Sequence, residues 1–121
     1  MERKIPKKIV LKDYVNLHKR AANPRYSKWN VFARDNYECA YCGSRVRPGE
    51  AQLEHIMPRS RGGISTWENT VTACPGCNSR KANRTPDEAG MPLRVRPFKP
   101  THGKWMEILL AKHFAKEIYG E

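Results

Sequence analysis

Long apolar runs are missing from this chain of 121 residues, and acidic side chains are scarce in it. Since no run of about 18 apolar residues occurs, the sequence predicts no membrane-spanning helix. The first residues, MERKIPKKIVLKDY, are basic and lack the continuous apolar stretch of a secretory signal. We therefore expect a cytoplasmic protein that is not secreted, associated with the nucleoid if its source is bacterial. The 23 basic residues outnumber the 12 acidic ones, and the net charge of +11 favours nucleic acid over an anionic membrane as the polyanionic partner.

Basic charge is concentrated near the N-terminus. Nine of the 23 Lys and Arg residues lie within residues 1–28, opposed only by Glu2 and Asp13. Two interpretations stay open for this segment, a solvated tail or an arm that contacts phosphates. We expect one domain overall, made of a basic arm and helix at 1–26, a central core at 27–91, and at 92–121 a Pro-rich linker with an amphipathic helix that packs on the core.

Apolar periodicity, with Pro and Gly as breakers, predicts short elements and a small α+β fold. Ser27 and Thr85 are typical helix caps, and Pro58 ends the first strand. The predicted elements are, in order, a helix that ends before Asn23-Pro24, a helix at 28–34, strands at 52–57 and 70–73, a helix from Pro75, a short turn between Thr85 and Gly90, and a helix at 103–119.

Apolar spacing also predicts which helix faces are buried. Trp29, Phe32 and Ala33 share one face of the helix at 28–34 and should face a core. In the C-terminal helix the predicted buried face consists of Trp105, Ile108, Ala111, Ala115 and Ile118. Trp67, in a loop, has two interpretations, a plug over a small core or a residue that stacks on a base.

The chain has only four cysteines, and they form two pairs, Cys39-Ala-Tyr-Cys42 and Cys74-Pro-Gly-Cys77. A gap of two residues lets both thiolates of a tight turn point at one ion, and two such turns complete a tetrahedral site. Two disulfides are the alternative for a secreted chain, and a redox site needs one such pair rather than two. We therefore predict one structural Zn²⁺ with all four cysteines as ligands, which also helps to stabilise a small core.

Several polar residues and a pair of glycines lie between and just after the cysteine pairs: Glu54-His55, Gly62-Gly63, Asn69, Asn78 and Lys81. Their order resembles the HNH endonuclease family, whose pattern runs acid-His, a Gly-Gly loop, an Asn, then Cys-x-x-Cys-(Asn/His)-x-x-Lys. The preceding segment, 32–43, resembles the lead-in of that family, and the likeness covers roughly residues 27–91. The resemblance implies a zinc-stapled ββα-metal (HNH/His-Me finger) core, in which two antiparallel strands and a helix surround one divalent cation, with flanking helices.

The resemblance also implies a role for each matched residue. His55 would be the general base that deprotonates the attacking water, Asn69 would position His55, and Asn78 would be a ligand of the catalytic cation. Glu54 stands where the family has an acid, commonly Asp, as the other ligand. Adjacent strand residues face opposite sides, so Glu54 and His55 share a site only if the strand twists or ends there. A surface carboxylate is the alternative for Glu54.

Elementary chemistry supports these roles. An imidazole with a pKa of about 6.5 suits a base that works near neutral pH. The oxygens of Glu54 and Asn78 suit Mg²⁺ or Mn²⁺, which would stabilise the charge that develops on the phosphate. Basic residues near this site are expected to contact phosphates, although each alone fits a solvated face equally well: Arg59, Arg61, Arg80, Lys81 and Arg84.

The sequence therefore predicts a metal-dependent HNH endonuclease that hydrolyses phosphodiester bonds in double-stranded DNA. Since the chain holds one copy of the motif, we expect a monomer that nicks one strand per event, whereas a symmetric dimer would be needed to cut both strands at once. The alternatives are a catalytically idle zinc module that only binds nucleic acid, and a structural zinc protein that contacts other proteins. His55, Asn69 and Asn78 together favour the nuclease, and the net charge of +11 disfavours the protein-binding alternative.

Overall fold

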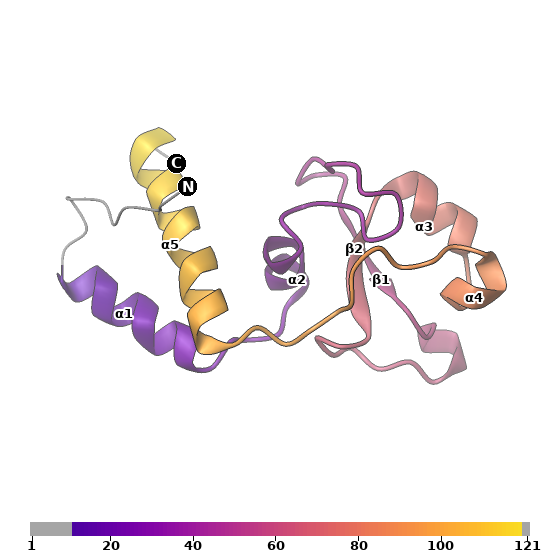
Figure 1. Ribbon diagram of the computed structural model, residues 1–121, viewed down its shortest axis with the longest axis horizontal. Helices are drawn as coiled ribbons and strands as arrows, with labels where there is room; N and C mark the ends of the chain where they lie inside the picture. The colour runs from indigo at the N-terminus through magenta and orange to yellow at the C-terminus, as the bar shows by residue number, and fades with distance from the viewer. Residues whose placement is uncertain (1–10, 120–121) are drawn as a thin grey trace. The chain divides into compact units, whose positions relative to one another are not determined.

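The computed structural model describes the backbone of residues 11–119 and the side chains of residues 11–115. The chain forms two compact units, one of residues 26–99 and one built from the segments on either side of it. Figure 1 shows the elements of both units. The part of the predicted basic arm at residues 1–10 lies outside the described residues.

The unit of residues 26–99 is a small α+β fold built on two antiparallel strands. Strand β1 spans Gln52–His55 and pairs with β2, Thr70–Ala73, so that His55 lies opposite Thr70. Helix α2, Lys28–Arg34, precedes the strands, and α3, Pro75–Lys81, follows β2 directly. Figure 1 shows α2 on one side of the strands and α3 on the other. A 3₁₀ turn, η1, at Arg59–Arg61 and a single-turn helix, α4, at Pro86–Ala89 complete the unit.

Local capping chemistry explains why several of these elements match their predicted bounds. The Ser27 hydroxyl accepts a hydrogen bond from the Asn30 amide at the start of α2. Thr85 and Glu88 form a reciprocal capping box on α4, which ends at Gly90 with a left-handed φ of 64°. The strand at 70–73 and the helix from Pro75 are likewise confirmed.

Strand β1 is shorter than predicted, ending at His55 rather than at Met57. The cause is Asn69, whose side-chain oxygen accepts the Met57 amide hydrogen at 3.0 Å. That amide is therefore bonded to a side chain, and the backbone ladder with β2 does not continue through it.

The core of this unit lies between β2, the cysteine-bearing turns and the segment after α4. Its buried members are Cys39, Ala40, Tyr41, Val46, Val71, Ala73, Cys77 and Met91. Phe32 of α2 is buried as predicted, but the prediction for Trp29 is wrong, because 54% of its surface is exposed. Its ring packs edge-on against Phe32 and lies under the Lys28 ammonium. Trp67 is 4% exposed, which confirms the plug and excludes base stacking.

The second unit pairs α1, Leu11–Ala22, with α5, His102–Tyr119. Leu17 and Ala21 of α1 are buried. The buried face of α5 consists of Trp105, Met106 and Leu109, whereas Ala111 and Ala115 are exposed. The prediction is therefore confirmed for Trp105 and wrong for Ala111 and Ala115, and the side chain of Ile118 lies outside the described residues. The placement of α5 on the central core stays a prediction. Among the described residues, neither α5 nor any other helix combines the length and apolar character needed to cross a membrane.

Candidate active site and zinc site

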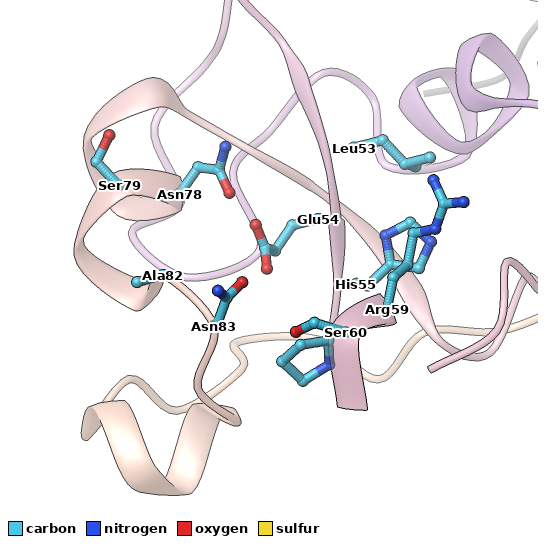
Figure 2. Close-up of a pocket in the computed structure, with 10 residues that line it drawn as sticks. Leu53, Glu54, His55, Arg59, Ser60, Asn78, Ser79, Ala82 and Asn83 are labelled. Carbon is cyan, nitrogen blue, oxygen red and sulfur yellow. The ribbon is translucent and has the colours of Figure 1, made fainter. Parts of the chain in front are cut away.

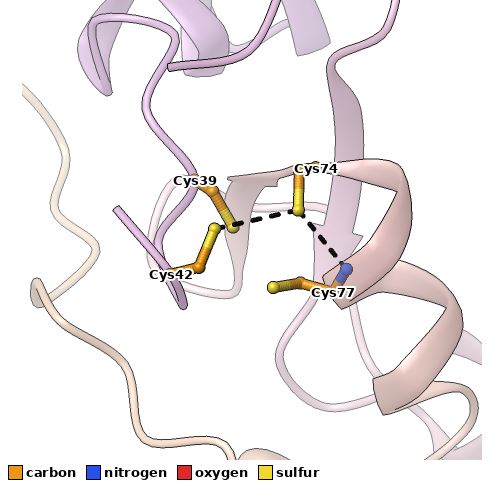
Figure 3. Close-up of side chains that lie close together, drawn as sticks. All are labelled: Cys39, Cys42, Cys74 and Cys77. Carbon is orange, nitrogen blue, oxygen red and sulfur yellow. Dashed lines mark hydrogen bonds between the residues drawn. The ribbon is translucent and has the colours of Figure 1, made fainter. Parts of the chain in front are cut away.

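Four cysteine side chains from two separate turns meet at the start of α3 (Figure 3). Their sulfur atoms all lie within 4.8 Å of one another, and the Cys42 and Cys74 sulfurs are 3.9 Å apart. A disulfide needs sulfurs about 2.05 Å apart, whereas Zn–S bonds of about 2.3 Å in a tetrahedron separate the sulfurs by about 3.8 Å. The donor set therefore fits one Zn²⁺ held by Cys39, Cys42, Cys74 and Cys77.

Local backbone geometry brings these sulfurs together. Cys74 caps the N-terminus of α3, and its sulfur accepts a hydrogen bond from the Cys77 amide at 3.4 Å. The first turn is closed by a hydrogen bond from the Gly43 amide to the Cys39 carbonyl at 2.9 Å. Gly43 has a φ of 77°, a left-handed conformation that Gly adopts without steric cost.

The four thiols differ in how readily they ionise. A hydrogen bond with the Ser44 hydroxyl, at 2.9 Å, lowers the pKa of Cys42 to about 6. Burial raises the pKa of Cys77 to about 12. Since zinc binds thiolates, a bound ion must displace the proton of Cys77, while Cys42 is already largely ionised at neutral pH.

Asn69 ties the two ends of the connection between β1 and β2 together. Its side-chain oxygen accepts from the Met57 amide at 3.0 Å, and its side-chain nitrogen donates to the Ile64 and Met57 carbonyls at 2.9 and 3.3 Å. Its backbone carbonyl accepts from the Ile56 amide at 2.9 Å. These bonds fix the chain directly after His55, which supports a positioning role for Asn69.

His55 is half-buried at the end of β1, and its Nε2 lies 2.9 Å from the Ser65 hydroxyl oxygen. Burial lowers the pKa of His55, and the positive charge of Arg59 lowers it further. The imidazole is therefore neutral at neutral pH, and an unprotonated ring nitrogen is available to accept a proton.

Glu54 leaves β1 on a different side from His55. Its side chain is 9% exposed, and its Oε1 accepts a hydrogen bond from the Lys81 ammonium at 2.8 Å. In Figure 2 the Glu54 carboxylate faces α3, next to Asn78 and Asn83, while the His55 ring lies across the strand from it. This divergence is the alternation that adjacent strand residues show.

Glu54, His55 and Asn78 nevertheless line one open cleft of about 600 Å³ between β1, the loop after it and α3. The Asn78 side-chain nitrogen donates to the Gln52 side-chain oxygen. This hydrogen bond fixes the orientation of the Asn78 side-chain amide. Figure 2 accordingly shows the amide oxygen of Asn78 pointing toward the Glu54 carboxylate. A carboxylate and an amide oxygen are hard donors, so this pair fits Mg²⁺ or Mn²⁺.

Residues 39–94, which contain this cleft and all four cysteines, match the family model described as HNH endonuclease. This segment belongs to the HNH endonuclease family. It is similar to the CRISPR-associated endonuclease Cas9 of Corynebacterium diphtheriae, with 31% identity over 74 residues, which are 60% of this chain and 7% of the relative. The Cas9 of Campylobacter jejuni is 30% identical over 93 residues, 71% of this chain and 9% of the relative. The HNH chain thus spans less than a tenth of these relatives.

One solved structure is also similar to the HNH chain. The crystal structure of the Type II-C Cas9 enzyme from Actinomyces naeslundii shares 19% sequence identity with it, at a TM-score of 0.48. The match covers 84% of this chain and 13% of that chain.

Four of the five basic residues predicted to contact phosphate are exposed on the unit that carries the HNH cleft: Arg59, Arg61, Arg80 and Arg84. Arg59 lines the cleft itself. Arg61 forms an ion pair with Glu88, whose pKa this contact lowers to about 2. The fifth, Lys81, lies elsewhere: its side chain has no exposed surface and is bonded to Glu54. The structure does not place Lys81 where a phosphate contact needs it.

Sequence reasoning missed three residues of the HNH cleft and its surroundings. Gln52 orients Asn78, and it lies two residues before Glu54 on the same face of β1, a spacing that points to it. Ser65 bonds to His55, and Asn83 lines the cleft beside Glu54 in Figure 2. Nothing in the local sequence marks these last two.

Arg34, at the end of α2, was missed as well. Its side chain is fully buried and donates to the carbonyls of Trp67, Thr70 and Phe98 at 2.6, 2.8 and 3.0 Å. It is also paired with Asp35 at 2.8 Å. Since Trp67 and Thr70 stand on either side of Asn69 in the chain, Arg34 holds the segment that carries Asn69.

Proposed function

We propose that this HNH chain is a metal-dependent endonuclease that hydrolyses phosphodiester bonds in double-stranded DNA. Membership of the HNH family and the similarity to Cas9 endonucleases support a nuclease. The observation that carries the proposal is the cleft, which a neutral His55 lines together with the hard oxygen donors of Glu54 and Asn78. Exposed arginines supply contacts for a phosphate backbone.

In this proposal His55 is the general base. One of its ring nitrogens accepts the proton of the water that attacks phosphorus. The Ser65 hydroxyl orients the ring through Nε2, and the bonds of Asn69 hold the backbone behind it. Glu54 and Asn78 would hold a Mg²⁺ or Mn²⁺ ion, which would stabilise the negative charge on the phosphate and the leaving oxygen. Arg59, at the cleft, orients the phosphate.

Zinc has a separate, structural role in this proposal. The four cysteines would hold a Zn²⁺ that ties the turn after α2 to the first turn of α3, and α3 carries Asn78. A site closed by four thiolates leaves no open position for substrate, so it takes no part in the reaction.

The sequence holds one copy of the HNH motif and so one His55, and a single copy would therefore activate one water for one phosphate. We propose a monomer that nicks one strand in each binding event. Cleavage of both strands at once needs a second copy placed across the duplex.

Supercoiled plasmid tests the proposal, with the zinc-loaded chain in Mg²⁺, in Mn²⁺ and without either ion. The expected result is open-circular DNA in both metals and intact plasmid without them, with linear DNA appearing only later. Binding to the plasmid without cleavage in any metal would favour the idle zinc module. Linear product that appears together with the open circle, from a species of twice the chain mass, would replace the nicking monomer with a dimer.

A further inference from the structure

We propose that Lys81 is a positioning residue of the HNH site, which orients the Glu54 carboxylate and holds the end of β1 from inside the unit. This rests on the proposed function, in which Glu54 is a ligand of the divalent cation. In this proposal Lys81 does not contact phosphate. The affinity of the cleft for the cation depends instead on the ion pair between Lys81 and Glu54.

Burial and hydrogen bonds carry the proposal. The Lys81 side chain is fully buried, and its ammonium donates to Glu54 Oε1 at 2.8 Å and to the His55 carbonyl at 2.9 Å. Lys81 therefore bonds to two consecutive residues of β1, one a candidate cation ligand and the other the candidate base. A buried ammonium with these two partners has no exposed surface left to offer to DNA.

The position of Lys81 on α3 adds a second reason. Lys81 is the last residue of α3 and follows Asn78 by three residues, a spacing that places both on one face of a helix. The helix thus presents Asn78 and Lys81 to the same carboxylate. A carboxylate has two oxygens and several lone pairs, so Lys81 can hold Oε1 while the remaining lone pairs stay available to a cation.

Charge gives the proposal a distinctive consequence. The ammonium lies close to the place where the cation would bind, so it repels that cation while it orients the ligand. Replacing Lys81 with Met, an apolar side chain of similar length, removes the repulsion and the orientation together. Cation binding should tighten while catalysis becomes slower, and neither a phosphate contact nor a purely structural role produces that combination.

The experiment measures Mn²⁺ binding to the zinc-loaded chain at pH 8 without DNA, by calorimetry, for wild type, Lys81→Met, Glu54→Gln and the double variant. We expect Lys81→Met to tighten Mn²⁺ binding at least fivefold and to slow cleavage at saturating Mn²⁺ at least tenfold. In the Glu54→Gln background, Lys81→Met should change Mn²⁺ binding less than twofold, since Lys81 acts through Glu54. Unchanged Mn²⁺ binding in Lys81→Met, with Glu54→Gln weakening it, would overturn the role of Lys81 alone.

DNA binding without added Mg²⁺ or Mn²⁺ supplies a second measurement, with Arg84→Met as the matched control. Arg84 lies three residues beyond Lys81 and is exposed. Arg84→Met should reduce the salt dependence of DNA affinity, and Lys81→Met should leave it unchanged. A reduced salt dependence in Lys81→Met would show that Lys81 contacts phosphate and would refute the proposal.

If Glu54→Gln has no effect on Mn²⁺ binding, the proposed cation site itself fails. Zinc content and thermal unfolding identify variants that do not fold. If Lys81→Met is unfolded, the double variant Glu54→Gln with Lys81→Met takes its place, because it buries no unpaired charge.

Discussion

Replacing Arg34 with Met should remove most of the stability of the unit formed by residues 26–99. The buried guanidinium is paired with Asp35 and bonded to three carbonyls, and its central carbon lies over the rings of Trp67 and Phe98. Removing one partner of a buried ion pair costs about 3–5 kcal/mol, and each buried carbonyl left without its donor adds about 1–3 kcal/mol. These terms overlap, so we expect a loss of about 5 kcal/mol.

Urea denaturation in saturating zinc, followed by tryptophan fluorescence, measures this loss. Since small domains have only about 5–15 kcal/mol of stability, Arg34→Met is expected to be at least partly unfolded in buffer. Arg34→Lys keeps the charge but not the fork of donors, and we expect it to fold with a loss of about 2–3 kcal/mol. Arg96→Met, at an exposed position of the same unit, is the matched control and should change the stability by less than about 0.5 kcal/mol. A loss below about 1 kcal/mol for Arg34→Met would refute the reasoning.

Three further predictions concern zinc, an ion pair and Asn69. Elemental analysis should find about one zinc per chain in wild type and almost none in Cys74→Ser, which should also lose cooperative unfolding; full zinc content in the variant would contradict the four-cysteine site. The hydrogen bond from Arg61 lowers the pKa of Glu88 to about 2 from an ordinary 4.5, so the pair stabilises the fold above pH 4.5 and this contribution is lost as the pH falls toward 2. A carboxyl NMR titration with an apparent pKa near 4.5 would show that the pair does not form. Asn69→Ala frees the Met57 amide and should slow single-turnover cleavage at least tenfold while DNA affinity stays within twofold; an unchanged rate would remove Asn69 from the account.

Elements whose limits depend on neighbouring residues were predictable from the sequence. Ser27 and Thr85 cap helices by bonds to residues three positions away, and Pro75 begins α3 directly after Cys74. The two-residue spacing of each cysteine pair likewise indicated the cluster of four sulfurs. Such contacts are local in the chain, and residue type alone specifies them.

Features that depend on distant partners were not predictable. The end of β1 is set by Asn69, which bonds to a residue twelve positions earlier. Lys81 is a residue type that favours the surface, and its burial follows from Glu54, 27 residues away. The face of α5 that is buried depends on how α1 packs against it, so the periodicity of α5 alone selected a different face.

The most direct test of the central claim compares wild type with His55→Ala on a labelled DNA duplex in Mn²⁺. Cleavage is measured under single-turnover conditions, and DNA affinity is measured separately without added Mg²⁺ or Mn²⁺. The account predicts that His55→Ala binds DNA with wild-type affinity and shows no cleavage above the metal-only background, because the variant lacks the base and keeps the phosphate contacts. Cleavage by His55→Ala at the wild-type rate would contradict the assignment of His55 as the general base of this nuclease.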